Sequence, residues 1–394
     1  MANVLISGTK PEAITAGQLT GERRHKLIGD LPEDYKFETE LEPHMRSADA
    51  YVFMPDADPL LAMSVLVAKR IEPDTYWNKP VVFVEEDGKR HPIAALFEDL
   101  SARGLAKEKP EEVFTIAKGI DQVRDVIGKV TEAPKAAADN SANTGDLATI
   151  QSDEKRPDTM IAVYCSASTK KPADLALAAE AGNSIAQRGW GITYGGANVS
   201  MMGAVASAAR NLDGYVLGVA TAKVWKHNRE LDPDNTDIPM SELKLTDDIY
   251  LRMKEMFMPE AGKPVKGVMV LPGGAGSAQE TLAMLQLRKA EPVFKDVPLV
   301  LINADGVWDG LAKAAKAYGL EEGKDFHVYP DVKSAMPFLD KAVAALDARP
   351  DWPVSDIDQA AKKLGGWRSD RRPAAGPASD IDAPAAKPGD QPAP

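Results

Sequence analysis

The sequence predicts an α/β protein in which a parallel β-sheet with helices on both faces occurs twice. Two observations lead to this fold class. Short apolar runs alternate with helical patterns, as crossover connections between parallel strands require. The same series of elements occurs once in residues 1–132 and again in residues 158–347. We therefore expect two Rossmann-like domains.

The repeat begins with an apolar strand that ends in proline. In the first domain this strand is Ala48–Pro55, and a helical run and then Glu72-Pro73 follow it. In the second domain the strand is Gly267–Pro272, and a helical run and then Glu291-Pro292 follow it. Each series continues with another apolar strand, an Asp-Gly turn and a Gly-Leu pair. The shared order and similar spacing indicate the duplication of one domain.

The second domain shows the alternation most clearly. In parallel sheets of this type, ligands bind beyond the carboxyl ends of the strands, so the turns that follow the strands are the places to look for a site. We expect strands near residues 160–165, 190–194, 215–219, 267–271 and 298–302, and helices near residues 172–188, 199–211, 246–258, 277–289 and 307–318.

Two stretches contain too little apolar sequence to form a core. Residues 133–157 are rich in Ala, Asp, Asn, Ser and Thr, and residues 348–394 are rich in Pro, Ala, Asp and Gly. Neither stretch buries enough apolar surface to offset the entropy cost of ordering. We expect a flexible linker and a disordered tail, in which Trp352 and Trp367 are the side chains suited to docking on a folded domain.

The composition excludes several classes of protein. The net charge of -12 argues against non-specific nucleic-acid binding and against a polybasic membrane patch, since both need a basic surface. Cys165 is the one cysteine, which excludes a disulfide within the chain and a cysteine-based zinc site. The five histidines show no metal-ligand spacing. Because the sequence shows no signal peptide and no apolar run of about 18 residues, we expect a soluble cytoplasmic protein without a metal site.

The strongest candidate site is the loop Pro272-Gly273-Gly274-Ala275-Gly276-Ser277, which joins an expected strand to an expected helix. Glycines let the backbone turn tightly and approach a ligand closely. The N-terminus of the helix directs free N–H groups and a positive dipole at the same point. The loop therefore predicts a phosphate site formed by Gly273, Gly274, Gly276 and Ser277.

Glu280 follows Ser277 by three residues, and this spacing has two interpretations. In a capping box, the Ser hydroxyl and the Glu carboxylate bond to the first amides of the helix. Alternatively, the carboxylate faces a ligand one helical turn away from its phosphate. The sequence alone leaves both interpretations open.

Two further turns end neighbouring strands and join the candidate site. One is Tyr194-Gly195-Gly196-Ala197, which precedes a helix that carries Met202; the other is Cys165-Ser166-Ala167-Ser168, which offers hydroxyl groups. The structural alternative for the second glycine turn is a tight turn followed by close packing of a helix through its small residues. Because the turns follow strands of one sheet, they are expected to converge on one crevice. The predicted substrate-binding residues in these turns and this helix are Gly195, Gly196, Ser166, Ser168 and Met202.

With these motifs, residues 158–347 resemble the LOG ("lonely guy") family, formerly described as lysine decarboxylases. The family motif is Pro-Gly-Gly-x-Gly-Thr-x-x-Glu, and this chain has PGGAGSAQE at 272–280, with Ser277 in place of Thr. VYCSAS at 163–168 and YGGANVSMMGAVA at 194–206 are similar to the other two family motifs. The chain departs from the family where Ser200 and Met201 replace the usual Gly-Leu, and where Met253 replaces a Lys.

The resemblance implies an enzyme that hydrolyses the N-glycosidic bond of nucleoside 5'-monophosphates, of the AMP or cytokinin riboside monophosphate type. The products are a free base and ribose 5-phosphate. By resemblance the catalytic pair is Glu280 and Arg252. A carboxylate that faces the ribose stabilises the positive charge that builds as the base departs and orients water. An arginine holds phosphate or assists the leaving base. Neither role requires a metal or a cofactor. The structural alternative for Arg252 is a solvated helix residue.

The first domain lacks this chemistry. Where the second domain has its glycine loop, the first has Asp56-Ala57-Asp58-Pro59. Two carboxylates repel phosphate, and Pro59 removes an amide donor. We expect a degenerate copy with a structural, interfacial or regulatory role, and we regard a metal site at Asp56 and Asp58 as the weaker alternative.

Other functions compete with glycosidic hydrolysis. A non-catalytic nucleotide sensor or carrier on the same fold fits the departures from the family pattern. An NAD(P)-dependent oxidoreductase is disfavoured, because no Gly-x-Gly-x-x-Gly follows the first strand of either domain. A decarboxylase is disfavoured too, because no residue pattern marks a lysine Schiff base to pyridoxal phosphate.

The resemblance also predicts a homodimer or a higher homo-oligomer, since proteins of the LOG type pair through helices of this domain. The duplication offers an alternative, in which the two domains of one chain pair with each other. The expected ligand is a nucleoside monophosphate, and neither nucleic acid nor a membrane is an expected partner.

Overall fold

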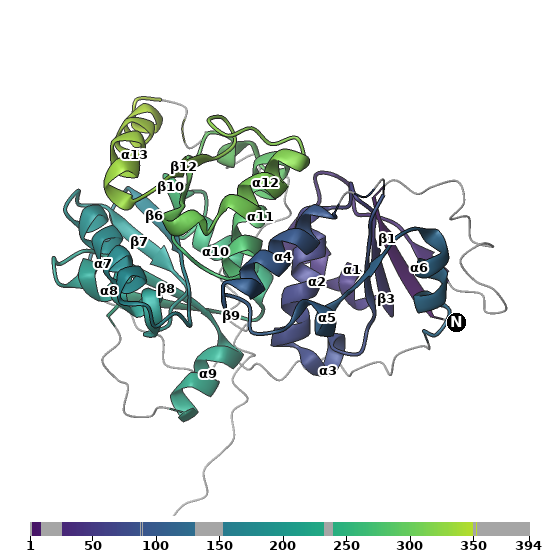
Figure 1. Ribbon diagram of the computed structural model, residues 1–394. Coiled ribbons are helices and arrows are strands. Elements are labelled where there is room, and N and C mark those ends of the chain that lie inside the picture. Colours follow the sequence, from purple (N-terminus) through teal and green to yellow (C-terminus); the bar gives the residue numbers. More distant parts are fainter. Residues whose placement is uncertain are drawn as a thin grey trace, which may run out of the picture. The chain divides into compact units, whose positions relative to one another are not determined.

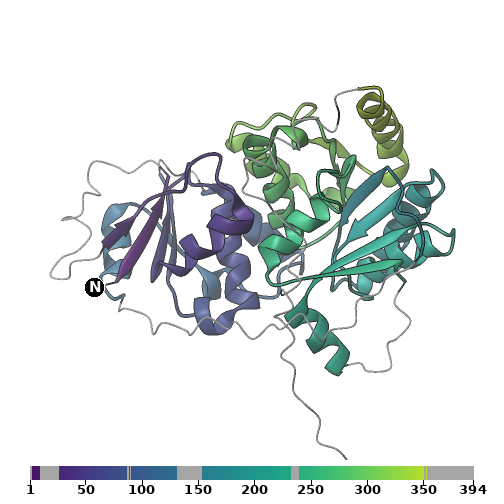
Figure 2. The same cartoon turned by 180° about the vertical axis from the view of Figure 1, so that it is seen from behind.

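The computed structural model contains two parallel sheets (Figures 1 and 2). It describes residues 2–8, 26–86, 88, 90–130, 153–231, 239–349 and 352. The expected linker falls largely on residues outside this description, as do the expected tail beyond Trp352 and, within it, Trp367.

The first domain has a five-stranded parallel sheet in the order β2-β1-β3-β4-β5. Prolines mark the helix starts of this domain. Each of the helices α1 to α5 has a proline in its first turn, where the missing N–H group would have no partner within the helix. The strands are β1 (Asn3–Ser7), β2 (Lys26–Ile28), β3 (Ala50–Phe53), β4 (Val81–Val84) and β5 (Thr115–Ala117). The helices are η2 (Phe37–Leu41), α1 (Glu42–Arg46), α2 (Pro59–Ile71), α3 (Pro73–Tyr76), α4 (Pro92–Ala102), α5 (Pro110–Val113) and α6 (Ile120–Ile127).

The second domain has a seven-stranded parallel sheet in the order β12-β11-β10-β6-β7-β8-β9. The strands are β6 (Met160–Tyr164), β7 (Gly191–Tyr194), β8 (Val216–Thr221), β9 (Glu242–Thr246), β10 (Gly267–Val270), β11 (Leu299–Ile302) and β12 (His327–Tyr329). The helices are α7 (Pro172–Ala186), α8 (Ser200–Arg210), α9 (Ala222–Leu231), α10 (Ile249–Phe257), α11 (Ala275–Ala290), η4 (Pro292–Phe294), η5 (Ala304–Gly306), α12 (Asp309–Ala317) and α13 (Val332–Asp347).

Helices cover both faces of the second sheet (Figure 1). Along β6, Ala162 and Tyr164 pack in the cluster that contains the apolar side chains of α10, α11 and α12. Ile161 and Val163 pack in the opposite cluster, with those of α7, α8 and α13. A strand that is buried on both faces needs a continuous apolar run, which is what the sequence provides there.

The strand order confirms the predicted duplication. Read from one edge, β5-β4-β3-β1-β2 of the first sheet matches β12-β11-β10-β6-β7 of the second, and the first sheet ends where the second adds β8 and β9. The equivalent helices follow equivalent strands, so α2 corresponds to α11 and α4 corresponds to α12. The Rossmann-like fold expected from the sequence is therefore present twice.

The five strands and five helices expected in the second domain are all present within a few residues of their expected bounds. Two strands and two α-helices of the described ranges were missed, besides the short helices η4 and η5. The strands β9 and β12 lie at the two edges of the sheet, and neither has the long apolar run of a central strand. The helix α9 is largely polar, and Pro337 interrupts the pattern of α13.

The last part of the expected linker contacts the second domain. Arg156 pairs with Glu242 at 2.6 Å, and Glu154 pairs with Arg210 at 2.7 Å. These two ion pairs join Glu154 and Arg156, at the end of the expected linker, to the second domain. Trp352 packs against the larger apolar cluster, as its docking prediction requires.

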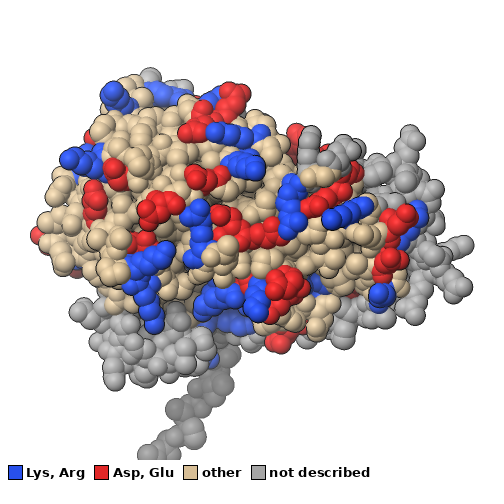
Figure 3. Space-filling model, viewed as in Figure 1, with Lys and Arg blue, Asp and Glu red and all other residues tan. Residues whose placement is uncertain are grey.

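The described ranges hold no helix with the length and apolar character that crossing a membrane would need. Figure 3 shows basic and acidic side chains interspersed on the face that it presents. This mixture gives that face no continuous basic stripe.

Candidate active site

The predicted turns meet at the carboxyl ends of β6, β7 and β10, which are neighbours in the sheet. The amide of Ser166 donates to the carbonyl of Pro272 at 2.9 Å. The hydroxyl of Ser277 lies 3.3 Å from the carbonyl of Cys165, to which it donates. The first-strand turn and the glycine loop are thus bonded to each other.

The glycine loop leads directly into α11, a helix of 16 residues with Gly274 as its N-cap. Among the residues that the structure describes, no side chain caps this helix start. Its first amides are therefore available to an anion. A Cβ built on Gly273 would lie 2.3 Å from the Ser277 hydroxyl oxygen, so a larger residue would displace that side chain. Gly276 is exposed and has open space around its Cα.

Glu280 and Arg252 form the central pair of the site. The Arg252 guanidinium, on α10, donates to the Glu280 carboxylate at 3.1 Å. It also donates through Nε to the carbonyl of Val219 at 2.8 Å. The two side chains are only 15% and 12% exposed. The sequence placed Arg252 in the site by resemblance, and the structure shows it paired rather than solvated.

Burial makes Glu280 a weaker acid than an exposed glutamate. Desolvation raises the pKa of this carboxyl from 4.5 to about 7, against the opposing effect of Arg252. At neutral pH the group therefore exists in both protonation states. A carboxyl with a pKa near the working pH is suited to accepting or donating a proton.

The capping-box interpretation of Ser277 and Glu280 is not what the structure shows. The N-cap position is held by Gly274, and Ser277 lies inside the helix, with its hydroxyl directed at Cys165. The Glu280 carboxylate bonds to Arg252, which belongs to another helix. Glu280 thus faces the centre of the candidate site.

The second glycine turn leaves room for the Arg252 guanidinium. A Cβ on Gly195 would lie 2.4 Å from Nη2 of Arg252 and 2.7 Å from the sulfur of Met202. Gly196 has φ of +73° and lies against the backbone of Val219, so this position also favours glycine. The turn therefore permits the guanidinium to approach the backbone closely.

The two serines of the first-strand turn differ in their exposure to solvent. Ser166 is buried, and its hydroxyl oxygen accepts from the amides of Ser168 and Thr169 at 3.1 and 3.0 Å. Ser168 is exposed, so its hydroxyl faces solvent. Ser166 shapes the turn. Burial raises the pKa of the Cys165 thiol, which keeps this side chain neutral and poorly nucleophilic.

Two departures from the family pattern lie away from the pair. Met253 and Met201 are fully buried in the apolar core. Ser200 has φ of +50°, and its hydroxyl donates to the carbonyl of Thr169 at 2.7 Å. These positions affect the packing and the turns around the site.

The equivalent turn of the first domain is built differently. Asp58 is the N-cap of α2 and accepts from the amide of Leu61 at 2.8 Å. Eight residues after Pro55, the first domain has Met63, whereas Glu280 stands eight residues after Pro272. In the described ranges, no group of three or more His, Cys, Asp or Glu is placed to hold a metal ion.

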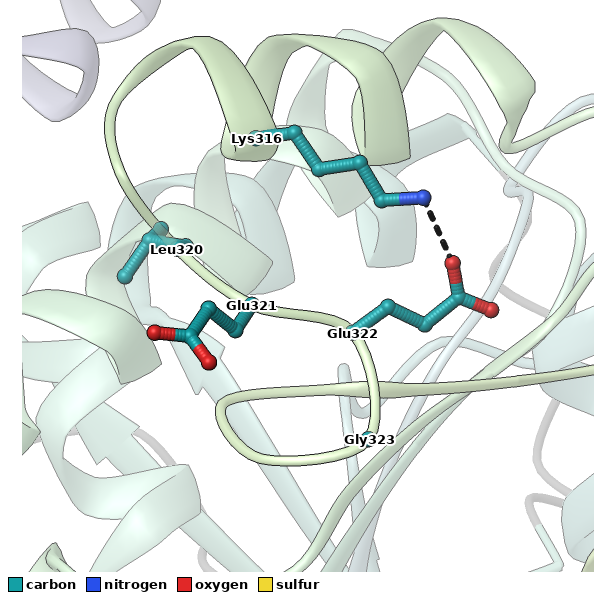
Figure 4. A pocket seen from close by; sticks show the side chains of 5 residues that line it. All are labelled: Lys316, Leu320, Glu321, Glu322 and Gly323. Atoms are coloured by element: carbon teal, nitrogen blue, oxygen red, sulfur yellow. Dashed lines mark hydrogen bonds and ion pairs between the residues drawn. The ribbon is translucent and has the colours of Figure 1, made fainter.

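A depression elsewhere on the second domain does not fit the same ligand. Figure 4 shows it lined by Lys316, Leu320, Glu321, Glu322 and Gly323. Lys316, the basic side chain of this lining, is already paired with Glu322 at 2.7 Å, so the depression does not suit a phosphate. We therefore place the candidate site at the glycine loop.

Sequence reasoning missed the backbone partner of Arg252. The Val219 carbonyl that fixes the guanidinium belongs to β8, and an apolar side chain in a strand gives no sign of such a role. Only the fold brings this carbonyl near α10.

Comparison with known proteins supports the assignment of the second domain. Residues 202–348 match a family model described as "Possible lysine decarboxylase". The chain is 38% identical over 154 residues to the cytokinin riboside 5'-monophosphate phosphoribohydrolase of Mycobacterium tuberculosis, covering 39% of this chain and 75% of that protein. The chain belongs to the LOG family. Its identity to the family member LOG of Oryza sativa is 30% over 150 residues, which cover 38% of this chain and 57% of that protein.

Among solved structures, a molybdenum cofactor carrier protein from Chlamydomonas reinhardtii is similar to this LOG-family chain. It is 19% identical, covers 48% of this chain and 99% of its own, and has a TM-score of 0.35. The residues of this chain that match the family model include Arg252, Glu280 and the glycine loop.

Proposed function

We propose that the second domain hydrolyses the N-glycosidic bond of a nucleoside 5'-monophosphate to a free base and ribose 5-phosphate. The observation that carries the proposal is the Glu280–Arg252 pair, which lies one helical turn beyond a glycine loop. Such a pair combines a group that stabilises positive charge with a group that binds anions. The relatives' names state this class of reaction on cytokinin riboside 5'-monophosphate.

In this proposal the phosphate binds to the amides of Gly273, Gly274 and Gly276 and to Ser277. The dipole of α11 adds to the attraction. Because the phosphate is fixed at the helix start, the ribose extends toward Glu280. Gly195, Gly196 and Met202 border the same space, where they support Arg252 beside the substrate.

The reaction breaks the bond between C1' and the base nitrogen, and the base takes the bonding electrons and a proton from solvent. Positive charge builds on the ribose ring, and the Glu280 carboxylate stabilises it. Water then bonds to C1' and gives up a proton to the ionised Glu280, which returns it to solvent. The pKa near 7 suits this exchange.

In this proposal Arg252 contacts different groups without and with bound substrate. Without substrate it bonds to Glu280 and to the Val219 carbonyl. With substrate present, its remaining donors reach either the phosphate or the departing base. Both roles need a permanent positive charge, which a guanidinium provides.

The test is an assay of purified protein with a panel of nucleoside 5'-monophosphates, with release of free base as the readout. We expect release from at least one adenine-type monophosphate and none from the corresponding nucleoside. Binding of AMP without release of base would instead support the nucleotide sensor or carrier. Equal affinity for adenosine and AMP would contradict the phosphate site.

Pairing of two chains remains a prediction from the sequence. In the structure, α11 and α12 already contact α2 and α4 of the same chain, so those faces are occupied. Any homodimer therefore needs another surface.

A further inference from the structure

The two domains contact each other through equivalent elements of the repeat. Both belong to one compact unit, Met1–Pro353. The helix α2 packs on its counterpart α11, and α4 packs on its counterpart α12. The segment η2, which precedes β3, packs on α10, which precedes the equivalent strand β10. Both domains therefore use the same surface patch for this contact, as the two subunits of an isologous dimer do.

The contacts at this interface are buried and specific. The amide nitrogen of Gln279 donates to the hydroxyl of Ser64 at 3.0 Å, and both side chains are essentially inaccessible. The ammonium of Lys254 on α10 lies 3.5 Å from the carboxylate of Glu38 on η2. The apolar side chains of α2, α4, α10, α11 and α12 form a single cluster across the two domains.

The loops beside the two equivalent turns show the same reciprocity. A Cβ on Gly274 would lie 2.2 Å from the carbonyl oxygen of Leu105, so this loop of the first domain lies directly on the glycine loop. In return, burial and then the Asp58 and Asp56 carboxylates of the equivalent turn of the first domain raise the pKa of the Tyr318 hydroxyl, as expected for a hydroxyl that lies near that turn. Leu105 and Tyr318 belong to equivalent segments of the repeat.

We propose that the first domain is a built-in pairing partner, which occupies the place of a second copy of the chain, and that its loop Arg103–Ala106 forms one wall of the glycine-loop site. The chain then completes its site without another chain. The pairing stands independently of the proposed function, whereas the role of the wall in nucleotide binding rests on it.

Arg103 anchors this wall. Its guanidinium donates to the carbonyl of Asp305 in the second domain at 3.1 Å and to Asp99 on its own helix at 3.0 Å. The reciprocal site cannot bind phosphate in the same way, because Asp58 and Met63 stand where the glycine loop and Glu280 stand in the second domain. One functional site per chain follows.

A disulfide tests the pairing directly. A Cβ on Gly310 of α12 would lie 3.7 Å from the Cβ of Asp99 on α4, which is the separation that a disulfide requires. The native Cys165 is buried, so it does not compete readily for oxidation. The variant carries both Asp99→Cys and Gly310→Cys, and the controls carry one substitution each.

After oxidation, we expect the double variant to form an intrachain disulfide, seen by mass spectrometry of peptides and by a monomer-sized, faster band on a non-reducing gel. Neither control should show this band. Disulfide-linked dimers, or free thiols after oxidation of a folded protein, would overturn the pairing. This readout needs no ligand, so it stands or falls separately from the proposed function.

The wall is tested by AMP binding to Arg103→Ala, measured by calorimetry. Loss of the anchoring bond to Asp305 should weaken binding about 3–10-fold. The matched control is Arg124→Ala on α6, whose guanidinium pairs with Asp121 at 2.9 Å. The control should bind AMP as the unaltered protein does. Equal affinity of Arg103→Ala and the control would overturn the wall, and AMP binding to neither would count against the proposed function instead.

Discussion

Glu280 and Arg252 show how a buried site changes the acidity of a carboxyl. Burial disfavours the charged carboxylate, while the guanidinium 3.1 Å away favours it. Burial is the stronger effect, so the pKa of Glu280 rises to about 7. A surface glutamate would be ionised throughout the physiological range and would not respond to pH there.

We predict that kcat/KM for the preferred nucleoside monophosphate rises with pH through about 7. The carboxylate is the form that stabilises the ribose cation and accepts the proton from water, and its fraction increases as Glu280 loses its proton. Initial rates between pH 5.5 and 8.5, at substrate concentrations well below KM, measure this profile. A flat or falling profile would contradict the role of the ionised form.

Gly195→Ala should reduce kcat/KM at least about 10-fold without unfolding the protein. The new Cβ would meet Nη2 of Arg252 and the sulfur of Met202, which are the ends of flexible side chains and can move. Movement of the guanidinium would separate it from Glu280. Thermal unfolding within a few degrees of the unaltered protein serves as the folding control. A folded variant with unchanged kcat/KM would show that the position of Arg252 is not limiting.

At the scale of single residues, the sequence predicted those parts of the site that follow from a local motif. Glu280 and the glycine loop are neighbours in the chain, and Arg252 came from the family resemblance. The Val219 carbonyl and the Leu105 loop were not predicted, because they reach the site only through strand pairing and domain pairing. The serine turn was predicted as a substrate-binding element. In the structure, the Ser166 hydroxyl oxygen accepts hydrogen bonds from two amides of the turn itself.

The equivalent helices α2 and α11 begin differently in the two domains. The helix α11 begins at a glycine without a side-chain cap, whereas α2 begins at Asp58, whose carboxylate caps it. A capped helix start has fewer free amides for an anion. The same position in the repeat therefore carries a side-chain cap in one copy, and in the other it is where we propose that the phosphate binds.

We predict that Asp56→Asn and Asp58→Asn leave turnover within a few-fold. Asparagine retains the cap at position 58, whereas Asp58→Ala should destabilise the protein by about 1 kcal/mol through loss of that cap. Rates with the preferred monophosphate and urea unfolding curves measure the two effects. A loss of two orders of magnitude in the rate of a stably folded Asn variant would show that the first domain takes part in the chemistry.

Central elements were easier to predict than edge elements. The strands β6, β10 and β11 are buried on both faces and read as apolar runs, whereas β9 and β12 lie at the sheet edges and have mixed sequences. Edge strands need less apolar surface, so their sequences carry a weaker signal. The helix α9 is polar enough to resemble a loop.

The whole molecule combines a copy that carries the glycine loop and Glu280 with a copy that lacks them. Duplication followed by divergence removes the need for both copies to keep the chemistry, since one copy can provide the interface alone. The sequence showed the duplication and the loss of the glycine loop. It left open whether the copies pair within a chain or between chains, because a repeat specifies equivalent surfaces without specifying the chain that supplies each.

We predict that the protein is a monomer in dilute solution, because α11 and α12 already pack on α2 and α4 within the chain. Light scattering at micromolar concentration should give a mass near 42.3 kDa. Twice that mass would instead agree with the homodimer that the family resemblance predicts, formed through a surface other than these helices.

The most direct test of the whole account is the turnover of Glu280→Gln with the preferred nucleoside monophosphate. The matched control is Glu255→Gln on α10, a buried carboxyl that pairs with Lys244 outside the site. A glutamine side chain in place of Glu280 would retain most of the ligand binding but carry no charge for the ribose cation. The account predicts a loss of about 100-fold or more in kcat for Glu280→Gln, and little change for the control. Unchanged turnover in a folded Glu280→Gln protein would contradict it.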